Sequence, residues 1–235
     1  TLQDYKLNGT QFAGGPPDIA KFFDPIRRDL VFKISRAAGM PEGIVAACEA
    51  YINNLQVYNC VAGGIGTPYT RICGIPPGCP FSMTMVALIM RSWILEMRNC
   101  IGISCYILAD DVLIISTGMT MASTFAKTLI ATHKYLHKMG ANVAPDKSYN
   151  FASSNKVRRW LKTSLWEHIE SGIEVISDFR YLGAHLTTRQ ATSKSTLDRR
   201  WDSAKQQLRR LRRCPASTEA KTKVILAKVY AGAMY

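Results

Sequence analysis

Residues 105–116 read CYILADDVLIIS, and the two adjacent aspartates in this stretch decide how the chain folds. The residues on both sides of Asp110 and Asp111 are apolar and β-forming, which predicts two short strands that fold back at the aspartate pair. An unpaired carboxylate in an apolar setting costs several kcal/mol, and two neighbouring carboxylates also repel each other. Turn chemistry is one explanation, because aspartate is common at hairpin tips. The apolar flanks favour another, in which the pair holds a cation.

Hard divalent ions with oxygen ligands, above all Mg²⁺, fit such carboxylates best. A site for two of these ions needs a third carboxylate from elsewhere in the chain. The segment DIAKFFD at residues 18–24 offers Asp18 and Asp24. If Asp18 ends a strand beside the hairpin, its side chain meets Asp110, whereas we interpret Asp24 as the N-cap of a helix beginning at Pro25. The seven cysteines show no CxxC pair and give no support to a zinc site.

Apolar periodicity and turn residues predict an α+β fold. Helical spacing covers residues 25–38, 41–53, 80–98, 119–139, 195–212 and 217–231, a hairpin is expected over 55–75, and short strands are expected at 103–116, 148–151 and 173–186. Helices that alternate with strands on one sheet are typical of an α+β sandwich. The stretch GTQFAGGPP at residues 9–17 is interpreted as loop or irregular strand, because glycine and proline are poor strand formers.

The chain has 235 residues and a formal net charge of +13, which is typical of proteins that bind a polyanion such as nucleic acid. Basic residues dominate after residue 194, where Arg209, Arg210, Arg212 and Arg213 form RRLRR. This cluster fits a phosphate-binding face and a solvated helix face about equally well. No apolar run reaches the roughly 18 residues of a membrane helix, and no signal peptide is recognisable. We therefore expect an intracellular protein without a membrane partner.

Five motifs follow one another in an order that resembles the palm of a reverse transcriptase. They are DxxxxFD at residues 18–24, GxPxGxPxS at 74–82, ADD at 109–111, a lysine after a glycine-stopped helix, and YLG at 181–183. The similarity is greatest to the non-LTR retrotransposon and group II intron branch. Each motif alone is weak, but five in the right order over residues 18–185 are a specific signal. The resemblance implies an RNA-directed DNA polymerase, which is a nucleotidyltransferase.

The same resemblance implies a domain organisation. Residues 1–190 would form a reverse-transcriptase palm with partial fingers, in which an antiparallel sheet packs on helices. Residues 191–235 would begin a basic helical thumb. We expect the chain to be a piece of a longer protein that also carries the missing fingers and thumb, with an endonuclease domain as a further candidate. A eukaryotic retroelement protein of this kind would act in the nucleus.

The metal site implied by the resemblance consists of Asp18, Asp110 and Asp111, with a backbone carbonyl from Ile19. It would hold two Mg²⁺ ions, for which Mn²⁺ can substitute, while a primer 3′-hydroxyl attacks the α-phosphate of a dNTP. Neighbouring residues on a strand point to opposite faces, so we expect Asp110 to bind the metals with Asp18 and Asp111 to play a secondary part. The implied partners are an RNA template, a DNA primer and the dNTP.

Four further residues would contact the nucleotide if the resemblance holds. Phe23 takes the place of the bulky residue under the sugar that excludes a 2′-hydroxyl, and Lys147 that of the lysine near the triphosphate. Pro77 and Gly78 belong to the segment that lies against template and incoming nucleotide. Plainer explanations remain open: a core aromatic for Phe23, a solvated turn lysine for Lys147, and a loop before a helix for Pro77 and Gly78.

The last motif, FRYLGAHL at residues 179–186, corresponds to the hairpin that grips the primer end. Tyr181, Leu182 and Gly183 would be its contact residues, although Tyr181 and Leu182 also suit a core. The basic helices that follow would hold the duplex by its phosphates.

Two departures from the family pattern motivate a competing hypothesis. The family usually has glutamine where this chain has Pro77, and proline can neither donate a backbone hydrogen bond nor supply an amide side chain. The stretch AGGPP before Asp18 also lacks the apolar strand that usually precedes this aspartate. The alternative is therefore a catalytically inactive RNA-binding scaffold. A third reading, an RNA-templated RNA polymerase, is disfavoured by the bulk of Phe23.

Overall fold

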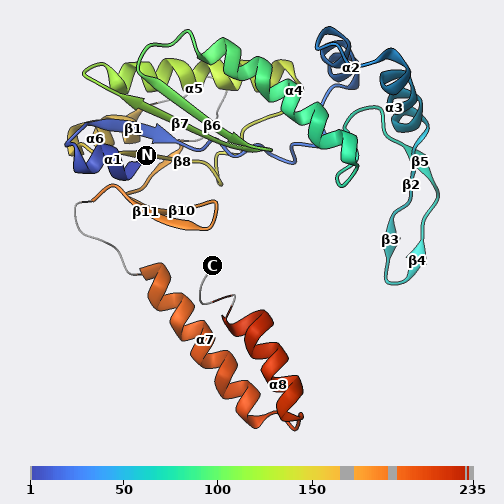
Figure 1. The fold of residues 1–235 in the computed structure, drawn as a ribbon. Coiled ribbons are helices and arrows are strands. Elements are labelled where there is room, and N and C mark those ends of the chain that lie inside the picture. The colour runs from blue at the N-terminus through green and yellow to red at the C-terminus, as the bar shows by residue number, and fades with distance from the viewer. Residues whose placement is uncertain (1, 165–171, 190–194, 231, 233–235) are drawn as a thin grey trace. The chain divides into compact units, whose positions relative to one another are not determined.

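The computed structural model describes residues 2–164, 172–189, 195–230 and 232 (Figure 1). Contacts divide the chain into two compact units, Thr1–Val175 and Ile176–Tyr235, which are described separately below. The predicted α+β class, an antiparallel-dominated sheet packed on helices, is confirmed. The functional division between residues 190 and 191 stays a prediction.

A five-stranded sheet with the order β6-β7-β1-β8-β9 forms the centre of the first unit (Figure 1). Its strands are β6 (Ile103–Leu108), β7 (Asp111–Thr117), β1 (Phe12–Gly15), β8 (Tyr149–Ala152) and β9 (Glu174–Val175). All neighbouring strands are antiparallel except β8 and β9, which run parallel. The hairpin predicted around the aspartate pair is confirmed as β6 and β7.

Two long helices, α4 (Pro80–Met97) and α5 (Met121–Lys138), lie on one face of this sheet (Figure 1). Both were predicted from their periodicity, and Pro80 begins α4 as expected. The indole of Trp93, fully buried on α4, donates a hydrogen bond to Thr132 Oγ1 of α5 at 3.1 Å. The Tyr135 hydroxyl donates to the Ile89 carbonyl at 2.7 Å. These bonds fix the two helices to each other above the strands.

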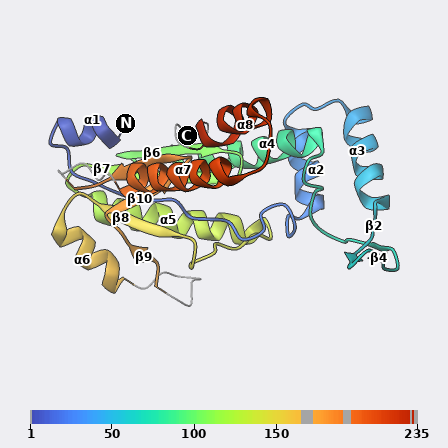
Figure 2. The ribbon, with the colours of Figure 1, turned by 90° about the horizontal axis from the view of Figure 1, so that it is seen from below.

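Helices α2 (Arg28–Ala37) and α3 (Glu42–Asn54) lie together at one end of the first unit, beside the start of α4 (Figures 1 and 2). Arg36 joins them by ion pairs to Glu42 at 2.9 Å and Glu49 at 2.8 Å. The predicted hairpin follows α3 and is confirmed. Its strands are β2 (Gln56–Val57) with β5 (Tyr69–Thr70), and β3 (Cys60–Val61) with β4 (Gly64–Ile65).

Two short helices at the opposite end of the unit, α1 (Leu2–Leu7) and α6 (Asn155–Thr163), were not predicted (Figure 2). Their signal is weak because α1 buries no residue and α6 buries only Leu161. The expected N-cap role of Asp24 is wrong. Helix α2 begins at Arg28, and the Asp24 carboxylate instead pairs with the guanidinium of Arg71, with Oδ1 and Nη1 2.6 Å apart.

Residues 9–17 were predicted as loop or irregular strand, but Phe12–Gly15 form the regular strand β1. It is the middle strand of the sheet, and all four of its residues are buried. A Cβ atom on Gly14 would lie 2.5 Å from the Ile114 carbonyl oxygen, and one on Gly15 would lie 2.6 Å from the Tyr149 carbonyl oxygen. Glycine is therefore required because neighbouring strands approach too closely for any side chain.

The second unit consists of a hairpin and a basic helical pair. Its elements are β10 (Asp178–Tyr181), β11 (Ala184–Thr187), α7 (Ser195–Arg213), α8 (Thr218–Val224) and the π-helical turn η1 (Ile225–Tyr230). The predicted helix start at Ser217 is confirmed, since its hydroxyl accepts a hydrogen bond from the Ala220 amide at 3.3 Å. Within the described residues, no helix has the length and apolarity needed to cross a bilayer.

Candidate active site

The sheet register brings the motif aspartates to one end of neighbouring strands. Pro16 and Pro17, which lack N–H groups, follow β1 and stop its ladder before Asp18. The last pair of this ladder is Gly15 with Ile114 of β7, and Asp18 and Asp111 each lie three residues beyond it. The turn between β6 and β7 lies at the same end. Strand pairing therefore directs Asp18 and the aspartate pair to the same end of the sheet, while their joint role in metal binding stays a prediction.

The backbone at Asp18 is held by the segment that leads into β8. The Asp18 amide donates to Ser148 Oγ at 2.9 Å, and its carbonyl accepts from the Ala144 amide at 2.8 Å. Ser148 Oγ in turn donates to the Ala144 carbonyl at 2.7 Å. The buried Ile19 forms an isolated bridge with Val143. The bonds of this bridge run through the residues on either side, so the pairing does not use the Ile19 carbonyl that was expected to face a metal.

The aspartate pair lies at the boundary between a turn and a strand. Leu108 pairs with Asp111, which leaves Ala109 and Asp110 as the turn residues. Ala109 has a φ of +57°, a left-handed conformation that is unfavourable for a residue with a Cβ. The premise that both aspartates lie on one strand is therefore wrong. Asp110 is partly buried and Asp111 is more exposed, while their functional ranking remains a prediction.

The charges of these carboxylates act on one another and on their pKa values. Burial raises the pKa of Asp18, Lys147 opposes this effect, and the charges of Asp110, Asp111 and Asp146 raise the pKa further. The pKa of Asp111 is raised as well, by the protein around its carboxyl group and then by Asp110, although the residue as a whole is exposed. Mutual repulsion of this kind is relieved when a cation binds between the groups.

Asp146 and Ser148 belong to this site, and the sequence reasoning missed both. Asp146 precedes Lys147 in APDKSYNF and was not predicted as a site residue, although its charge raises the pKa of Asp18. Lys147 itself is exposed, and its charge lowers the pKa of Asp18, while its predicted role near the triphosphate stays a prediction. No local pattern distinguishes Asp146 and Ser148 from ordinary turn residues, because their contacts with Asp18 arise only in the folded chain.

The donor chemistry of the site suits a hard divalent ion. The groups around Asp18 are carboxylates, and oxygen ligands of this kind are those that Mg²⁺ and Mn²⁺ prefer. Within the part of the chain that the structure describes, however, no three His, Cys, Asp or Glu side chains are close enough to hold a metal ion as they stand. Metal binding therefore requires the carboxylates to move closer together than they are here.

We expect Asp18→Asn to raise the thermal stability of the protein at neutral pH by a few degrees. The pKa of Asp18 is higher in the folded chain than its ordinary value, so the folded chain binds this proton more tightly than the unfolded chain. Stability is then lost as pH rises through the interval between the two pKa values. The variant removes this loss, and thermal unfolding at pH 7 measures the gain.

The same comparison below about pH 3.5, where aspartate is mostly protonated in either state, should show little difference between the two proteins. Adding Mg²⁺ at pH 7 should raise the melting temperature of the unmodified protein more than that of the variant. A variant that melts below the unmodified protein at pH 7 would show that the Asp18 carboxylate is a stabilising group and not a repelled one.

Phe23 and the start of the GIPPGCP segment are joined through their backbones. The Ile75 amide donates to the Phe23 carbonyl at 2.9 Å, and the Gly74 amide donates to the Ile26 carbonyl at 2.8 Å. The Phe23 ring is partly buried and packs edge-on against Phe22, with ring centroids 5.7 Å apart. The structure thus brings together two motifs that are about fifty residues apart in the sequence, as the resemblance implies.

Pro77 and Gly78 lie exposed in the turn that leads into α4. Gly78 has a φ of +83°, and with Pro77 it lines a groove of about 750 Å³ against α3. The buried hydroxyl of Ser82 donates to the Pro76 carbonyl at 2.8 Å, which explains the serine that closes the GxPxGxPxS motif. The segment is therefore a well-anchored loop with an exposed tip, a form suited to contact with a ligand.

The remaining predicted contact residues belong to the second unit. Leu182 and Gly183 form the β10–β11 turn, with φ values of +46° and +82°, and Tyr181 pairs with Ala184 at its base. Arg200 of α7 donates to the Gly183 carbonyl at 2.7 Å, a tie between hairpin and helix that the sequence did not reveal. All four arginines of RRLRR, namely Arg209, Arg210, Arg212 and Arg213, are exposed on α7.

Comparison with known protein families gives a match over residues 17–186 to the family described as Reverse transcriptase (RNA-dependent DNA polymerase). The chain belongs to this family. The matched residues of this reverse transcriptase domain include the motif aspartates, the GIPPGCP segment, Lys147 and the YLG turn. Among curated proteins there was no match.

Solved telomerase structures share the fold of this reverse transcriptase domain. They include apo telomerase from Candida tropicalis truncated from the C-terminal domain (13% identity, TM-score 0.56, 80% of this chain and 36% of that chain). Telomerase from Candida tropicalis with a TWJ fragment of telomeric RNA gives 12% identity and a TM-score of 0.57, and the match covers 99% of this chain and 40% of that chain. Telomerase from Candida albicans with the same kind of RNA fragment gives 14% identity and a TM-score of 0.50, and the match covers 86% of this chain and 36% of that chain. The domain thus spans well under half the length of these telomerase chains.

Proposed function

We propose that this reverse transcriptase domain is the RNA-directed DNA polymerase of a retroelement of the non-LTR or group II intron branch. It transfers a nucleotide from a dNTP to the 3′-hydroxyl of a primer. The observation that carries the proposal is the pairing of β1 with β7, because β1 leads to Asp18 at the end of the sheet where the Asp110–Asp111 turn also lies. Family membership and the order of the five motifs support the same conclusion.

Asp18, Asp110 and Asp111 would hold two Mg²⁺ ions, or Mn²⁺ in their place, together with the Ile19 carbonyl. When bound, such ions lower the pKa of an attacking hydroxyl and neutralise charge on the phosphates. The residues of the chain supply position. Ser148 and Ala144 hold the backbone of Asp18 through its amide and its carbonyl. Catalysis by this class of site is mainly placement and charge stabilisation.

The nucleotide is selected and neutralised by residues around the carboxylates. Lys147 places a positive charge beside Asp18, where it can balance a triphosphate and supply a proton to the departing pyrophosphate. Phe23 presents its ring to the sugar and excludes a 2′-hydroxyl by bulk. Pro77 and Gly78 offer an exposed surface to template and base. The net charge of +13 and the exposed arginines of α7 favour phosphate contacts with an RNA template and DNA primer.

Primer extension by the purified protein tests the proposal. On an RNA template with a DNA primer, we expect extension that requires Mg²⁺ or Mn²⁺ and is abolished by a chelator. Deoxynucleotides should be incorporated much faster than ribonucleotides, because Phe23 leaves no room for a 2′-hydroxyl. Rapid extension with ribonucleotides would favour an RNA polymerase on the same fold. Increasing salt should weaken template binding steeply, as expected for contacts to phosphates.

The alternative is a reverse-transcriptase-like RNA-binding scaffold without catalysis. Two observations favour it: Pro77 replaces a hydrogen-bonding glutamine, and the carboxylates in the described part of the chain are not assembled around a metal position. Isothermal titration with Mg²⁺ and a dNTP distinguishes the two functions. A binding signal that disappears in Asp18→Asn supports the polymerase, whereas RNA binding without any nucleotide signal supports the scaffold.

A further inference from the structure

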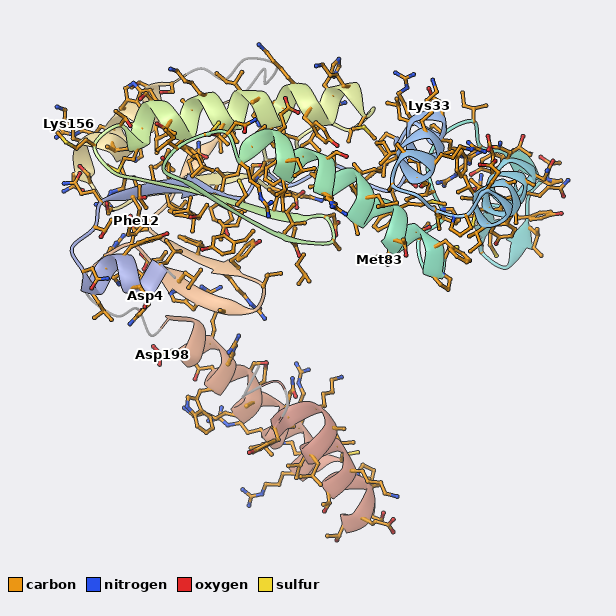
Figure 3. All side chains as sticks on the ribbon, turned by 45° about the horizontal axis from the view of Figure 1, so that its top comes forward. Asp4, Phe12, Lys33, Met83, Lys156 and Asp198 are labelled. Atoms are coloured by element: carbon orange, nitrogen blue, oxygen red, sulfur yellow. The ribbon has the colours of Figure 1, made fainter. Side chains whose placement is uncertain are left out.

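Arg28, the first residue of α2, makes contacts that neither the motifs nor the proposed mechanism explain. Its Nε donates to the Gly74 carbonyl at 2.7 Å, and its Nη1 donates to the Arg71 carbonyl at 2.6 Å. A longer bond of 3.4 Å joins Nη1 to Asn53 Oδ1 at the end of α3. One guanidinium thus connects both helices to the chain that leaves the β2–β5 hairpin, beside the start of α4 that carries Met83 (Figure 3).

The loop after this contact depends on such anchors. Pro76 and Pro77 have no backbone N–H, so the loop is held mainly at its two ends. At its start, Gly74 and Ile75 donate to the carbonyls of Ile26 and Phe23. Gly74 has a φ of +82°, and any Cβ there would collide with the Asp24 carbonyl oxygen. The guanidinium of Arg28 therefore caps the loop where its backbone crosses the Phe23 segment most closely.

A second tie reinforces the first. The Arg71 guanidinium donates to Asp24 Oδ1 at 2.6 Å, so both ends of the Arg71–Gly74 stretch are attached to the segment that begins α2. Asp24, Arg28 and Arg71 line a cavity of about 200 Å³ together with Pro77. Arg28 is partly buried there, and burial lowers its pKa from the usual arginine value. Its charge-assisted bonds are thus partly shielded from water, which strengthens them.

We propose that Arg28 is a positioning residue that sets the separation between Phe23 and the Pro77–Gly78 tip and so determines selection for dNTPs. The proposal rests on the polymerase function inferred above. The Ile75 amide donates a hydrogen bond to the Phe23 carbonyl. Because Pro76 and Pro77 have fixed φ angles, the position of the Pro77–Gly78 tip depends on the position of Gly74. Without the guanidinium, the loop can move away from Phe23 and admit a 2′-hydroxyl.

The test compares Arg28→Lys and Arg28→Met with Arg36→Lys. Lysine keeps the charge but cannot bond both carbonyls through a rigid fork. Arg36 is a matched control, because it lies on the same helix and also makes several hydrogen bonds, but only to Glu42 and Glu49. In primer extension, both Arg28 variants should raise the KM for dNTP by about tenfold and reduce discrimination against ribonucleotides, with kcat within about twofold. Arg36→Lys should leave all three values unchanged.

The possible results distinguish a failure of the Arg28 proposal from a failure of the polymerase function on which it rests. If the unmodified protein extends primers and the Arg28 variants match Arg36→Lys, the positioning role is wrong and the polymerase function stands. The role is also wrong if kcat falls with an unchanged KM, or if both variants are unfolded at the assay temperature. Binding of a fluorescent dNTP in Mn²⁺ provides a readout without turnover, in which the Arg28 variants should bind about tenfold more weakly. An unmodified protein that neither extends a primer nor binds the dNTP overturns both proposals.

Discussion

Asp110→Asn is expected to reduce dNTP incorporation by about a thousandfold or more while leaving the fold intact. Each carboxylate in a two-metal site contributes several kcal/mol of charge stabilisation to the transition state, and asparagine keeps the shape of the side chain but loses its charge. Of the two adjacent aspartates, Asp110 has the larger effect on the pKa of Asp18, which favours Asp110 as the partner of Asp18 in the proposed site. Single-nucleotide incorporation at saturating dNTP measures the loss.

Two variants serve as controls for this result. Asp4→Asn removes an exposed carboxylate in α1, at the far end of the first unit from α2 and α3, and should incorporate nucleotides at the normal rate. Asp111→Asn should lose less activity than Asp110→Asn. The melting temperature of Asp110→Asn should equal or exceed that of the unmodified protein, because one repelling charge is gone. Normal primer extension by a folded Asp110→Asn protein would refute the proposed catalytic site.

Elements with strong apolar periodicity were predictable from sequence. Helices α4 and α5 bury a large share of their residues, and their limits agree with the prediction to within one or two positions. The β6–β7 hairpin was equally clear, because two β-forming runs flank an obvious turn. In each case the local pattern and the tertiary environment favour the same structure.

The errors occur where a distant contact outweighs a local preference. Asp24 is a residue type that is common at helix N-caps. Its carboxylate nevertheless pairs with Arg71, 47 residues away in the sequence. Ser148 and Arg28 likewise make hydrogen bonds to residues far away in the sequence, and the charge of Asp146 acts on Asp18 over a similar separation. The aspartates of the motifs could be recognised because their chemistry is unusual in an apolar run. The residues that support them are ordinary amino acids, so only the folded chain reveals their role.

Strand β1 is the clearest case, because its composition argued against a strand at all. Glycine weakens an isolated strand, but here two glycines permit the central strand to lie against both neighbours without steric conflict. The Phe151 ring of β8 fills the space beside Gly14, with its Cζ 2.9 Å from where a Cβ would be. The same strand ends three residues before Asp18. The AGGPP sequence, which seemed a departure from the family pattern, thus includes most of the buried strand that leads to Asp18, the first aspartate of the proposed site.

Gly14→Ala should therefore destabilise the protein by about 3 kcal/mol and lower its melting temperature by roughly 10 °C. The added methyl would lie 2.5 Å from the Ile114 carbonyl oxygen, and neither this backbone atom nor the packed Phe151 ring can move without disturbing the sheet. Because β1 leads directly to Asp18, a shift of the strand should also slow dNTP incorporation at temperatures where the variant remains folded. Thermal unfolding and primer extension on the same preparation measure the two effects.

Gly172→Ala is the matched control for this substitution. A Cβ at Gly172 meets no atom of the described residues within 4 Å, so the same added methyl should change neither the melting temperature nor the rate of incorporation. The decisive comparison is between activity and stability in Gly14→Ala. A stable variant with normal activity would mean that the β1–β7 spacing is wider than described here, and the pairing that leads β1 to Asp18 beside the aspartate turn would lose its support. A folded but slow variant ties that pairing directly to catalysis.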